Sequence, residues 1–194
     1  PYPTRPAAYD MQGIRETDAN DWTPEIKAEA LRVLNLHKYS DNVFEPPIER
    51  GQDGKFGMLM MPGNNGGTNW EGGAFDPETN VLYVGSFTNP FIAALEPPPA
   101  PSDITYISGG GAQLPWLQGL PLIKPPWGRI TAIDLNKGEQ RWMTPNGDGP
   151  RDHPLLKPLN LPPLGSPGRS SPLVTKTLLF LGEGSPAMAG LGSR

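Results

Sequence analysis

Two polar loops of this sequence contain side chains that could bind a ligand. One loop, "PNGDGPRDH", carries oxygen ligands and an imidazole that could bind a divalent cation, at Asn146, Asp148, Asp152 and His153. Their spacing does not match the calcium loop of an EF-hand, so an ordinary polar loop is the alternative interpretation. The other loop, "GNNGGTNW", places the Asn69 amide, which both donates and accepts hydrogen bonds, in a glycine-rich turn.

Several classes of chemistry are excluded or disfavoured by what the sequence lacks. The chain of 194 residues contains no cysteine, so it has no disulfide, thiolate nucleophile or cysteine-bound metal. No Ser-His-Asp or paired-carboxylate arrangement has a defensible spacing, and "SGGGA" lacks the lysine and the helix of a phosphate loop. The net charge of −4, without a basic block, disfavours nucleic acid as a partner. We therefore assign no catalytic residue and no metal ligand to this chain.

One helix is expected, over about residues 24–35 of "TPEIKAEALRVLNL". Thr23 can cap its start, Pro24 suits the first helical position, and apolar residues recur at every fourth position from Ile26. His37 follows the last turn and can cap the free carbonyl groups there. We interpret this helix as a packing element within an insertion.

The rest of the chain, with 24 glycines and 26 prolines in the whole sequence, is typical of short strands joined by loops. Turns are indicated by "DPETN", by "NKGE" and by Lys176-Thr177. They predict antiparallel strands at about residues 72–76, 81–86, 129–135, 139–144, 171–175 and 178–182. Because "VLYV" and "RITAIDL" are apolar on both faces, their sheets should be covered on both sides, as in a β-propeller.

The hairpin over residues 129–144 has a spacing of residue types with a structural explanation. Ala132 is small enough to let a neighbouring ring approach, and Asp134 can bind backbone N–H groups of the turn. Gly138 supplies the backbone freedom that the turn needs. Trp142 is then expected to lie mostly buried against the neighbouring blade.

This pattern, A-x-D-x-x-x-G-x-x-x-W, resembles the tryptophan-docking motif of the dehydrogenases that depend on pyrroloquinoline quinone (PQQ), which are eight-bladed β-propellers. "GTNWEGGAFDPETNVLYV" looks like the segment that brings a cofactor-contacting asparagine to the propeller axis. "PYPTRPAAYDMQG" and "PPWGRITAIDLNKGEQRW" look like stretches of the membrane-associated glucose, quinate and polyol branch. The resemblance covers nearly the whole chain, although Lys137 stands where the motif usually has Thr or Ser.

The resemblance implies an all-β fold: a fragment of about one and a half blades, with one inserted α-helix and long Pro/Gly-rich loops. Residues 1–55 would form an extended arm and a helical insertion, and residues 56–194 a partial β-propeller. The complete blade would span 66–144 with an insert at 87–127, and the next half blade would span 170–184. We expect a processed product or a piece of a longer protein, because the chain starts without an initiator Met or a signal peptide.

The resemblance also implies which residues meet the cofactor. Asn69 would reach the quinone edge of PQQ, Trp70 would be a blade-packing or cofactor-contacting residue, and Arg169 would face the cofactor's carboxylates. The alternatives are an asparagine that only ties its turn and a solvated loop arginine. The family's catalytic aspartate and metal-ligating Glu and Asn lie upstream of the matched segment. The ligands of the Ca²⁺ or Mg²⁺ ion would therefore not be in this chain.

The implied activity is oxidation of a sugar, polyol or alcohol in the periplasm, with electrons passing to PQQ and on to ubiquinone or a cytochrome. The remaining blades or a partner chain would complete the propeller, and any attachment to the inner membrane would use parts outside this chain. Arg169 stands where the alcohol-oxidising branch often has a tryptophan, so the substrate stays open. The isolated chain is expected to be inactive. The alternative function is a non-catalytic β-propeller scaffold that binds proteins.

Overall fold

The computed structural model describes residues 4–109, 114, 117–183 and 185–186, and the chain divides into two compact units. The first unit consists of Pro1–Met11, Asn65–Asn89 and Pro125–Arg194, and the second of Gln12–Asn64 and Pro90–Lys124. This grouping follows contacts and not chain order, so a division at residue 55 falls inside the second unit. Each unit is described by itself.

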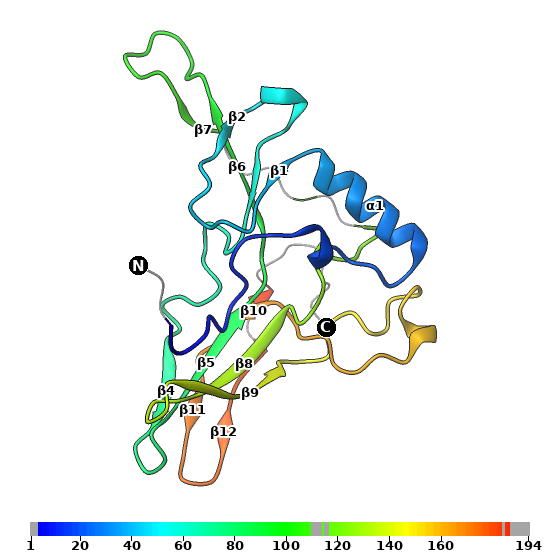
Figure 1. The fold of residues 1–194 in the computed structure, drawn as a ribbon. Helices are drawn as coiled ribbons and strands as arrows, with labels where there is room; N and C mark the ends of the chain where they lie inside the picture. The colour runs from blue at the N-terminus through cyan, green and yellow to red at the C-terminus, as the bar shows by residue number, and fades with distance from the viewer. Residues whose placement is uncertain (1–3, 110–113, 115–116, 184, 187–194) are drawn as a thin grey trace. The chain divides into compact units, whose positions relative to one another are not determined.

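A four-stranded antiparallel sheet forms the centre of the first unit (Figure 1). Its strands, in spatial order, are β4 (Gly73–Asp76), β5 (Val81–Phe87), β8 (Gly128–Asp134) and β9 (Glu139–Pro145). Strands that pair in chain order, with an insert between the second and the third, make one blade of a propeller. The first four predicted strands are confirmed to within one residue at each end.

The turn between β8 and β9 is closed by the chemistry predicted for it. The Asp134 carboxylate accepts hydrogen bonds from the backbone N–H groups of Asn136 at 3.0 Å and Lys137 at 3.1 Å. Gly138 has a φ of +64°, in the left-handed region where glycine is preferred, and its N–H donates to the Asp134 carbonyl at 2.8 Å. The roles expected of Asp134 and Gly138 are therefore confirmed.

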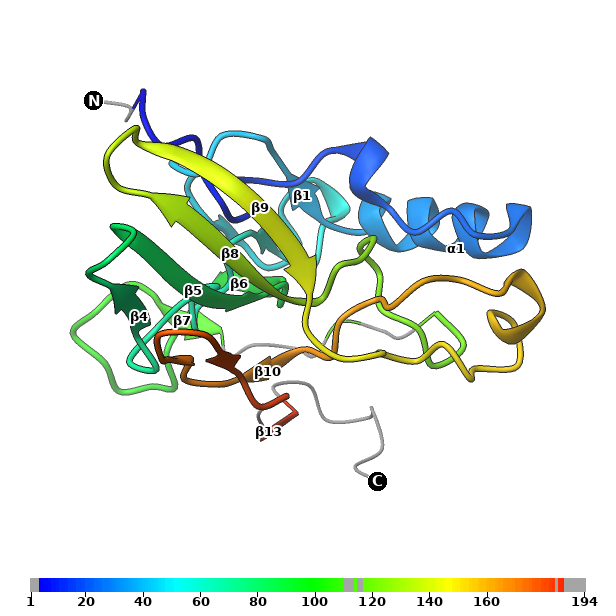
Figure 2. The ribbon, with the colours of Figure 1, turned by 90° about the horizontal axis from the view of Figure 1, so that it is seen from below.

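Trp142 contacts a ring of its own blade. Tyr83, Ala132 and Trp142 lie in one row across β5, β8 and β9, so they share a face of the sheet. Because Ala132 is fully buried and has no atom beyond Cβ, the rings of Tyr83 and Trp142 approach over it to 5.8 Å between centroids. The aromatic rings next to Ala132 thus belong to its own blade. Trp142 is 43% exposed in this chain, where β9 is the edge strand of its sheet (Figure 2) and most residues of β9 are exposed. The expected burial of Trp142 against a neighbouring blade stays a prediction for the complete propeller.

Burial is concentrated in β8, where every residue from Gly128 to Ile133 is buried. Ile130 and Ile133 point to opposite faces, and both are at most 5% exposed, which confirms that the strand is covered on both sides. Leu135 was expected to extend this apolar pattern. It lies beyond the end of β8 and is exposed, because the chain turns toward β9 after Asp134.

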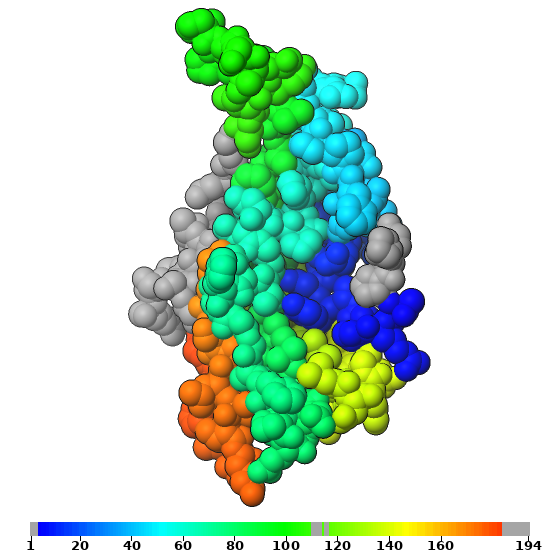
Figure 3. All heavy atoms as spheres, turned by 90° about the vertical axis from the view of Figure 1, so that its left-hand side faces the viewer, coloured from blue at the N-terminus to red at the C-terminus, as the bar shows by residue number. Residues whose placement is uncertain are grey.

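A second, shorter hairpin begins the next blade. It consists of β11 (Leu173–Val174) and β12 (Leu179–Phe180), both shorter than predicted, joined by the expected tight turn at Lys176-Thr177. β11 lies beside β4, and β10 (Gly168–Arg169), which pairs with β13 (Ser185–Pro186), lies beside β5. In Figure 3 this hairpin, in orange, runs along the surface of the β4–β5 hairpin. The described residues thus hold one blade and the start of another, and their sheets do not close into a ring.

The second unit contains the helix and a five-stranded sheet. These elements are α1 (Pro24–Asn35), β1 (Lys38–Tyr39), β2 (Ile48–Glu49), β3 (Met58–Met60), β6 (Phe91–Glu96) and β7 (Ile107–Gly109). The strand order is β1-β3-β6-β2, and β7 also pairs with β6. Two short 3₁₀ helices lie here, η1 (Glu16–Asp18) and η2 (Gln52–Gly54), and η3 (Lys157–Leu159) lies in the first unit.

Helix α1 begins and ends as predicted. Thr23 Oγ1 accepts a hydrogen bond from the backbone N–H of Ile26 at 3.2 Å, and Pro24 is the first helical residue. At the other end, His37 is buried, and its Nδ1 lies 2.8 Å from the carbonyl oxygen of Val33. Within the described residues, no helix combines the length and apolar character that crossing a bilayer requires.

Candidate functional site

The loop that precedes β4, residues 65–72, contains the first candidate residue, Asn69. Its Nδ2 donates to the Asn65 carbonyl at 3.2 Å, and its Oδ1 accepts from the Trp70 backbone N–H at 2.9 Å. Its backbone carbonyl accepts from Gly72 at 3.0 Å. Asn69 therefore ties the turn, as one interpretation predicted. The amide still has one N–H and further lone pairs that these bonds do not use, so the turn leaves it able to meet a ligand.

Trp70 projects from the same loop. Its side chain is 95% exposed in this chain. Whether Trp70 packs against another blade or contacts the cofactor stays a prediction. The backbone of Asn69 and Gly72 folds tightly on either side of it, which leaves the indole outside the turn. An indole in this position offers a flat apolar face on which a planar ring can stack.

Arg169, the third candidate, is brought to this loop by the fold. It lies in β10 at the start of the next blade, and its Nε is 3.5 Å from Glu71 Oε1. Both side chains are more than half buried, so Arg169 is held in place, in contrast to the alternative of a solvated loop arginine. Glu71 was not predicted as a site residue. No signal in the sequence could have found it, because its partner lies in a different strand pair far along the chain.

Two hydrogen bonds fasten the start of the loop to β5. The backbone N–H of Phe87 donates to the Gly67 carbonyl at 2.9 Å, and Thr68 Oγ1 donates to the Gly85 carbonyl at 3.3 Å. The loop that carries Asn69, Trp70 and Glu71 is therefore fixed to β5, and its Glu71 contacts Arg169.

The polar loop after β9 does not assemble a cation site. The Asn146 side chain donates to the Gly182 carbonyl at 2.9 Å, and Asp148 forms an ion pair with Arg151 at 2.8 Å. Across the residues that the structure describes, no three His, Asp or Glu side chains stand close enough to share a metal ion.

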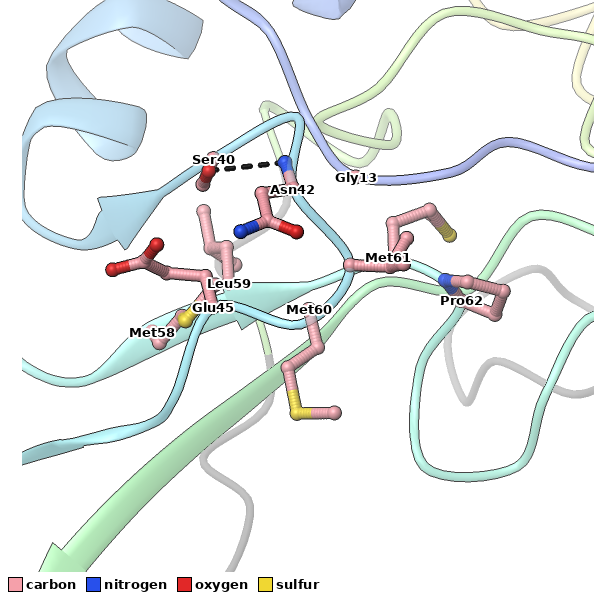
Figure 4. A pocket seen from close by; sticks show the side chains of 10 residues that line it. Gly13, Ser40, Asn42, Glu45, Met58, Leu59, Met60, Met61 and Pro62 are labelled. Carbon is pink, nitrogen blue, oxygen red and sulfur yellow. Dashed lines mark hydrogen bonds between the residues drawn. The ribbon is translucent and has the colours of Figure 1, made fainter. Parts of the chain in front are cut away.

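A small pocket in the second unit lies apart in sequence from the predicted residues (Figure 4). It is lined by Gly13, Ser40, Asn42, Val43, Glu45 and the segment 58–62. Its polar groups have partners: Ser40 Oγ accepts from the Asn42 backbone N–H at 3.0 Å, and Glu45 forms an ion pair with Lys38. We do not assign it a ligand.

Comparison with known proteins shows where a blade of this kind is found. Residues 1–188 match the family described as "PQQ: Glucose/ethanol/alcohol dehydrogenase, beta-propeller domain". This chain belongs to the PQQ-dependent dehydrogenase family. The partial propeller is thereby confirmed as the fold, and the four-stranded sheet is a blade of the quinoprotein β-propeller.

Three curated relatives support the glucose, quinate and polyol branch. The quinoprotein glucose dehydrogenase of Escherichia coli (strain K12) is 32% identical over 162 residues, which cover 70% of this chain and 20% of that protein. The glycerol dehydrogenase large subunit of Gluconobacter thailandicus is 28% identical over 214 residues, covering 93% of this chain and 28% of that protein. The quinate/shikimate dehydrogenase (quinone) of Acinetobacter baylyi is 28% identical over 201 residues, covering 89% of this chain and 24% of that protein. The chain thus spans between 20% and 28% of the length of these quinoproteins.

Proposed function

We propose that this chain is the part of a PQQ-dependent dehydrogenase that contributes Asn69, Trp70 and Arg169 to the cofactor site. The whole protein would oxidise a sugar, polyol or alcohol. The observation that carries the proposal is the ion pair between Glu71 and Arg169, which joins two distant segments next to an exposed tryptophan. A purely structural turn has no need of an exposed indole next to a glutamate that pairs with a distant guanidinium.

The three side chains suit the chemistry of PQQ, a flat ortho-quinone that carries carboxylates. The spare N–H of Asn69 can donate to a quinone or carboxylate oxygen. The exposed face of Trp70 can stack on the ring system. Arg169 contacts Glu71 through its Nε, and a guanidinium pairs well with a carboxylate of the cofactor. These residues would bind and orient the cofactor, which accepts two electrons from the substrate.

Other parts of the enzyme would complete the reaction. A divalent ion, Ca²⁺ or Mg²⁺, would be held by residues outside this chain, and so would the group that takes the substrate's proton. We further propose a periplasmic location and transfer of the electrons to ubiquinone or a cytochrome. The relatives named for glucose, glycerol and quinate support a polyhydroxylated substrate without selecting one.

The test is the affinity of the full-length protein for PQQ, measured by titrating the apoprotein with the cofactor. We expect Arg169→Ala to weaken PQQ binding by at least about tenfold, since removing a charge-assisted contact to a carboxylate costs about 1.5–3 kcal/mol. Asn69→Ala should weaken it less, because it loses a neutral hydrogen bond. Arg151→Ala is the matched control: Arg151 also pairs with one carboxylate, that of Asp148, and it lies in the loop after β9. If Arg169→Ala binds PQQ no more weakly than Arg151→Ala, the proposed site is wrong.

A further inference from the structure

A buried ion pair connects the N-terminal arm to the blade. Arg129 of β8 is 5% exposed, and its Nη2 contacts the carboxylate of Asp10, whose side chain is 10% exposed. Its Nη1 donates to Thr88 Oγ1 at 2.7 Å and to the Pro126 carbonyl at 2.9 Å. Burial lowers the pKa of Arg129 to about 10, while Tyr9 acts in the opposite direction, so the guanidinium remains charged at neutral pH. A buried charge of this kind needs its carboxylate partner.

The same Asp10 carboxylate touches the 65–72 loop. A Cβ atom built at Gly67 would overlap Asp10 Oδ2. The φ of Gly67 lies outside the left-handed region, so space for the carboxylate, and not backbone conformation, requires glycine here. The Asp10 side chain cannot easily move aside, because Arg129 holds it. The absence of a side chain at Gly67 thus lets the Asp10 carboxylate approach the loop closely.

Gly67 is also where the loop is bound to β5, through its carbonyl group and the Phe87 N–H. Asn69 follows two residues later. The position of Gly67 between the Asp10 carboxylate and β5 therefore determines where the loop begins to turn toward Asn69 and Trp70.

We propose that Asp10 and Arg129 are positioning residues for the cofactor loop. The ion pair presses a fixed carboxylate against Gly67, and Gly67 in turn sets the place of Asn69 and Trp70. This inference rests on the proposed role of the 65–72 loop in PQQ binding.

Attachment of the arm alone does not explain this pair. The arm is already joined to β9 by the exposed Arg5–Glu139 ion pair at 3.8 Å. The Gln140 side chain also donates to the carbonyl groups of Ala7 at 3.2 Å and Ala8 at 3.1 Å. A buried ion pair costs desolvation that surface contacts do not, so it is a poor means of attachment. Its distinct effect is to hold a carboxylate at Gly67.

The first measurement is hydrogen exchange of the full-length apoprotein, without PQQ. Asp10→Asn removes the charge of the carboxylate, and Gly67→Ala displaces the carboxylate without removing either charged group. We expect both to speed exchange of amides in the 65–72 loop by about tenfold, with β8 and β9 amides changed less in Gly67→Ala. Glu139→Gln, which removes the exposed arm pair, is the matched control and should leave the loop unchanged.

The second measurement is the Kd for PQQ. Displacement of binding groups by about 1 Å can cost up to about a hundredfold, so we expect Gly67→Ala to raise the Kd by about ten- to a hundredfold. In an Asp10→Ala background, which has room for the new methyl group, Gly67→Ala should add little, because the two residues act through one contact. A purely additive double variant would overturn the inference.

The outcomes separate this inference from the proposed function. Unchanged loop exchange in both Asp10→Asn and Gly67→Ala overturns the positioning role, and so does equal loosening by Glu139→Gln. If the wild-type protein does not bind PQQ, yet its loop responds as expected, the cofactor proposal fails and Asp10 still positions the loop. If the loop exchange and the Kd for PQQ both change as expected, the positioning role and the cofactor site are both supported.

Discussion

The β8–β9 hairpin and the 65–72 loop form parts of the same blade unit but are held in place by different kinds of contact. In the hairpin, Asp134 binds residues two and three positions further on, so the turn is closed by its own sequence. In the loop, Asn69 makes local bonds, but the loop as a whole is placed by Phe87, Arg169 and Asp10. The contacts that close the hairpin join neighbouring residues, whereas the contacts that place the loop join residues far apart in the sequence.

This difference separates structure from function within the blade. A hairpin that closes itself can recur in every blade with the same few residues, because it depends on nothing outside itself. A loop placed by distant segments can bring together groups from two blades and the arm, which is what a ligand site requires. The site in turn depends on every segment that holds it.

The 65–72 loop should support no chemistry without the rest of the propeller. We expect the isolated 194-residue chain, supplied with PQQ and Ca²⁺, to show no turnover of glucose or glycerol with an artificial electron acceptor. The loop is proposed to supply only cofactor contacts, and the family resemblance implies that the base and the metal ligands lie upstream of the matched segment. Saturable turnover would show that catalytic groups exist in this chain.

The self-contained packing of the hairpin can be tested at Ala132. Replacement by Leu should destabilise the blade by about 1–3 kcal/mol, because the side chain is fully buried between the Tyr83 and Trp142 rings. Hydrogen exchange of β8 amides in the full-length protein would measure this. Arg141→Leu, on the exposed strand β9 of the same hairpin, is the control and should change little. Equal protection in both variants would mean that Ala132 is not tightly enclosed.

Trp142→Ala distinguishes packing inside the blade from packing between blades. The ring contact with Tyr83 and the partial burial predict a loss of about 1–1.5 kcal/mol. A fully buried tryptophan would instead cost about 3–5 kcal/mol. The same β8 exchange measurement, made on the full-length protein, decides between them. The larger loss would show that a neighbouring blade covers Trp142 in the complete propeller, as its docking role implies.

The smallest effect concerns pH at the other hairpin of the blade. The hydroxyl of Thr79 and the backbone N–H of Glu78 donate to the exposed Asp76 carboxylate and lower its pKa below the ordinary 3.8. Because the folded-state pKa is lowered, the contribution to stability is present above the unfolded-state value and is lost as pH falls through the folded-state value. Thr79→Val should therefore raise the pKa of Asp76 toward 3.8, as followed by NMR titration. A pKa unchanged by the substitution would exclude the hydroxyl as the main cause.

The family and its blade could be recognised from the sequence because the decisive signals are local. The spacing from Ala132 to Gly138 specifies a turn, and the turn bonds of Asp134 and the φ of Gly138 follow from it. The same holds for α1, where Thr23 and His37 mark both ends. Local hydrogen bonding, the alternation of strands and the helical period need only neighbouring residues, so these predictions were confirmed.

Tertiary structure decided what depends on residues far apart in the chain. Trp142 is half exposed because β9 is an edge strand, and Trp70 is outside its turn because Gly72 closes back on Asn69. The pairing of Glu71 with Arg169 and the buried contact of Asp10 with Arg129 join segments that no sequence pattern relates. A long-range ion pair forms only where the backbone path brings its two residues together. The sequence by itself therefore determined the blade and the cofactor class, and only the fold decided which side chains stand together at the loop.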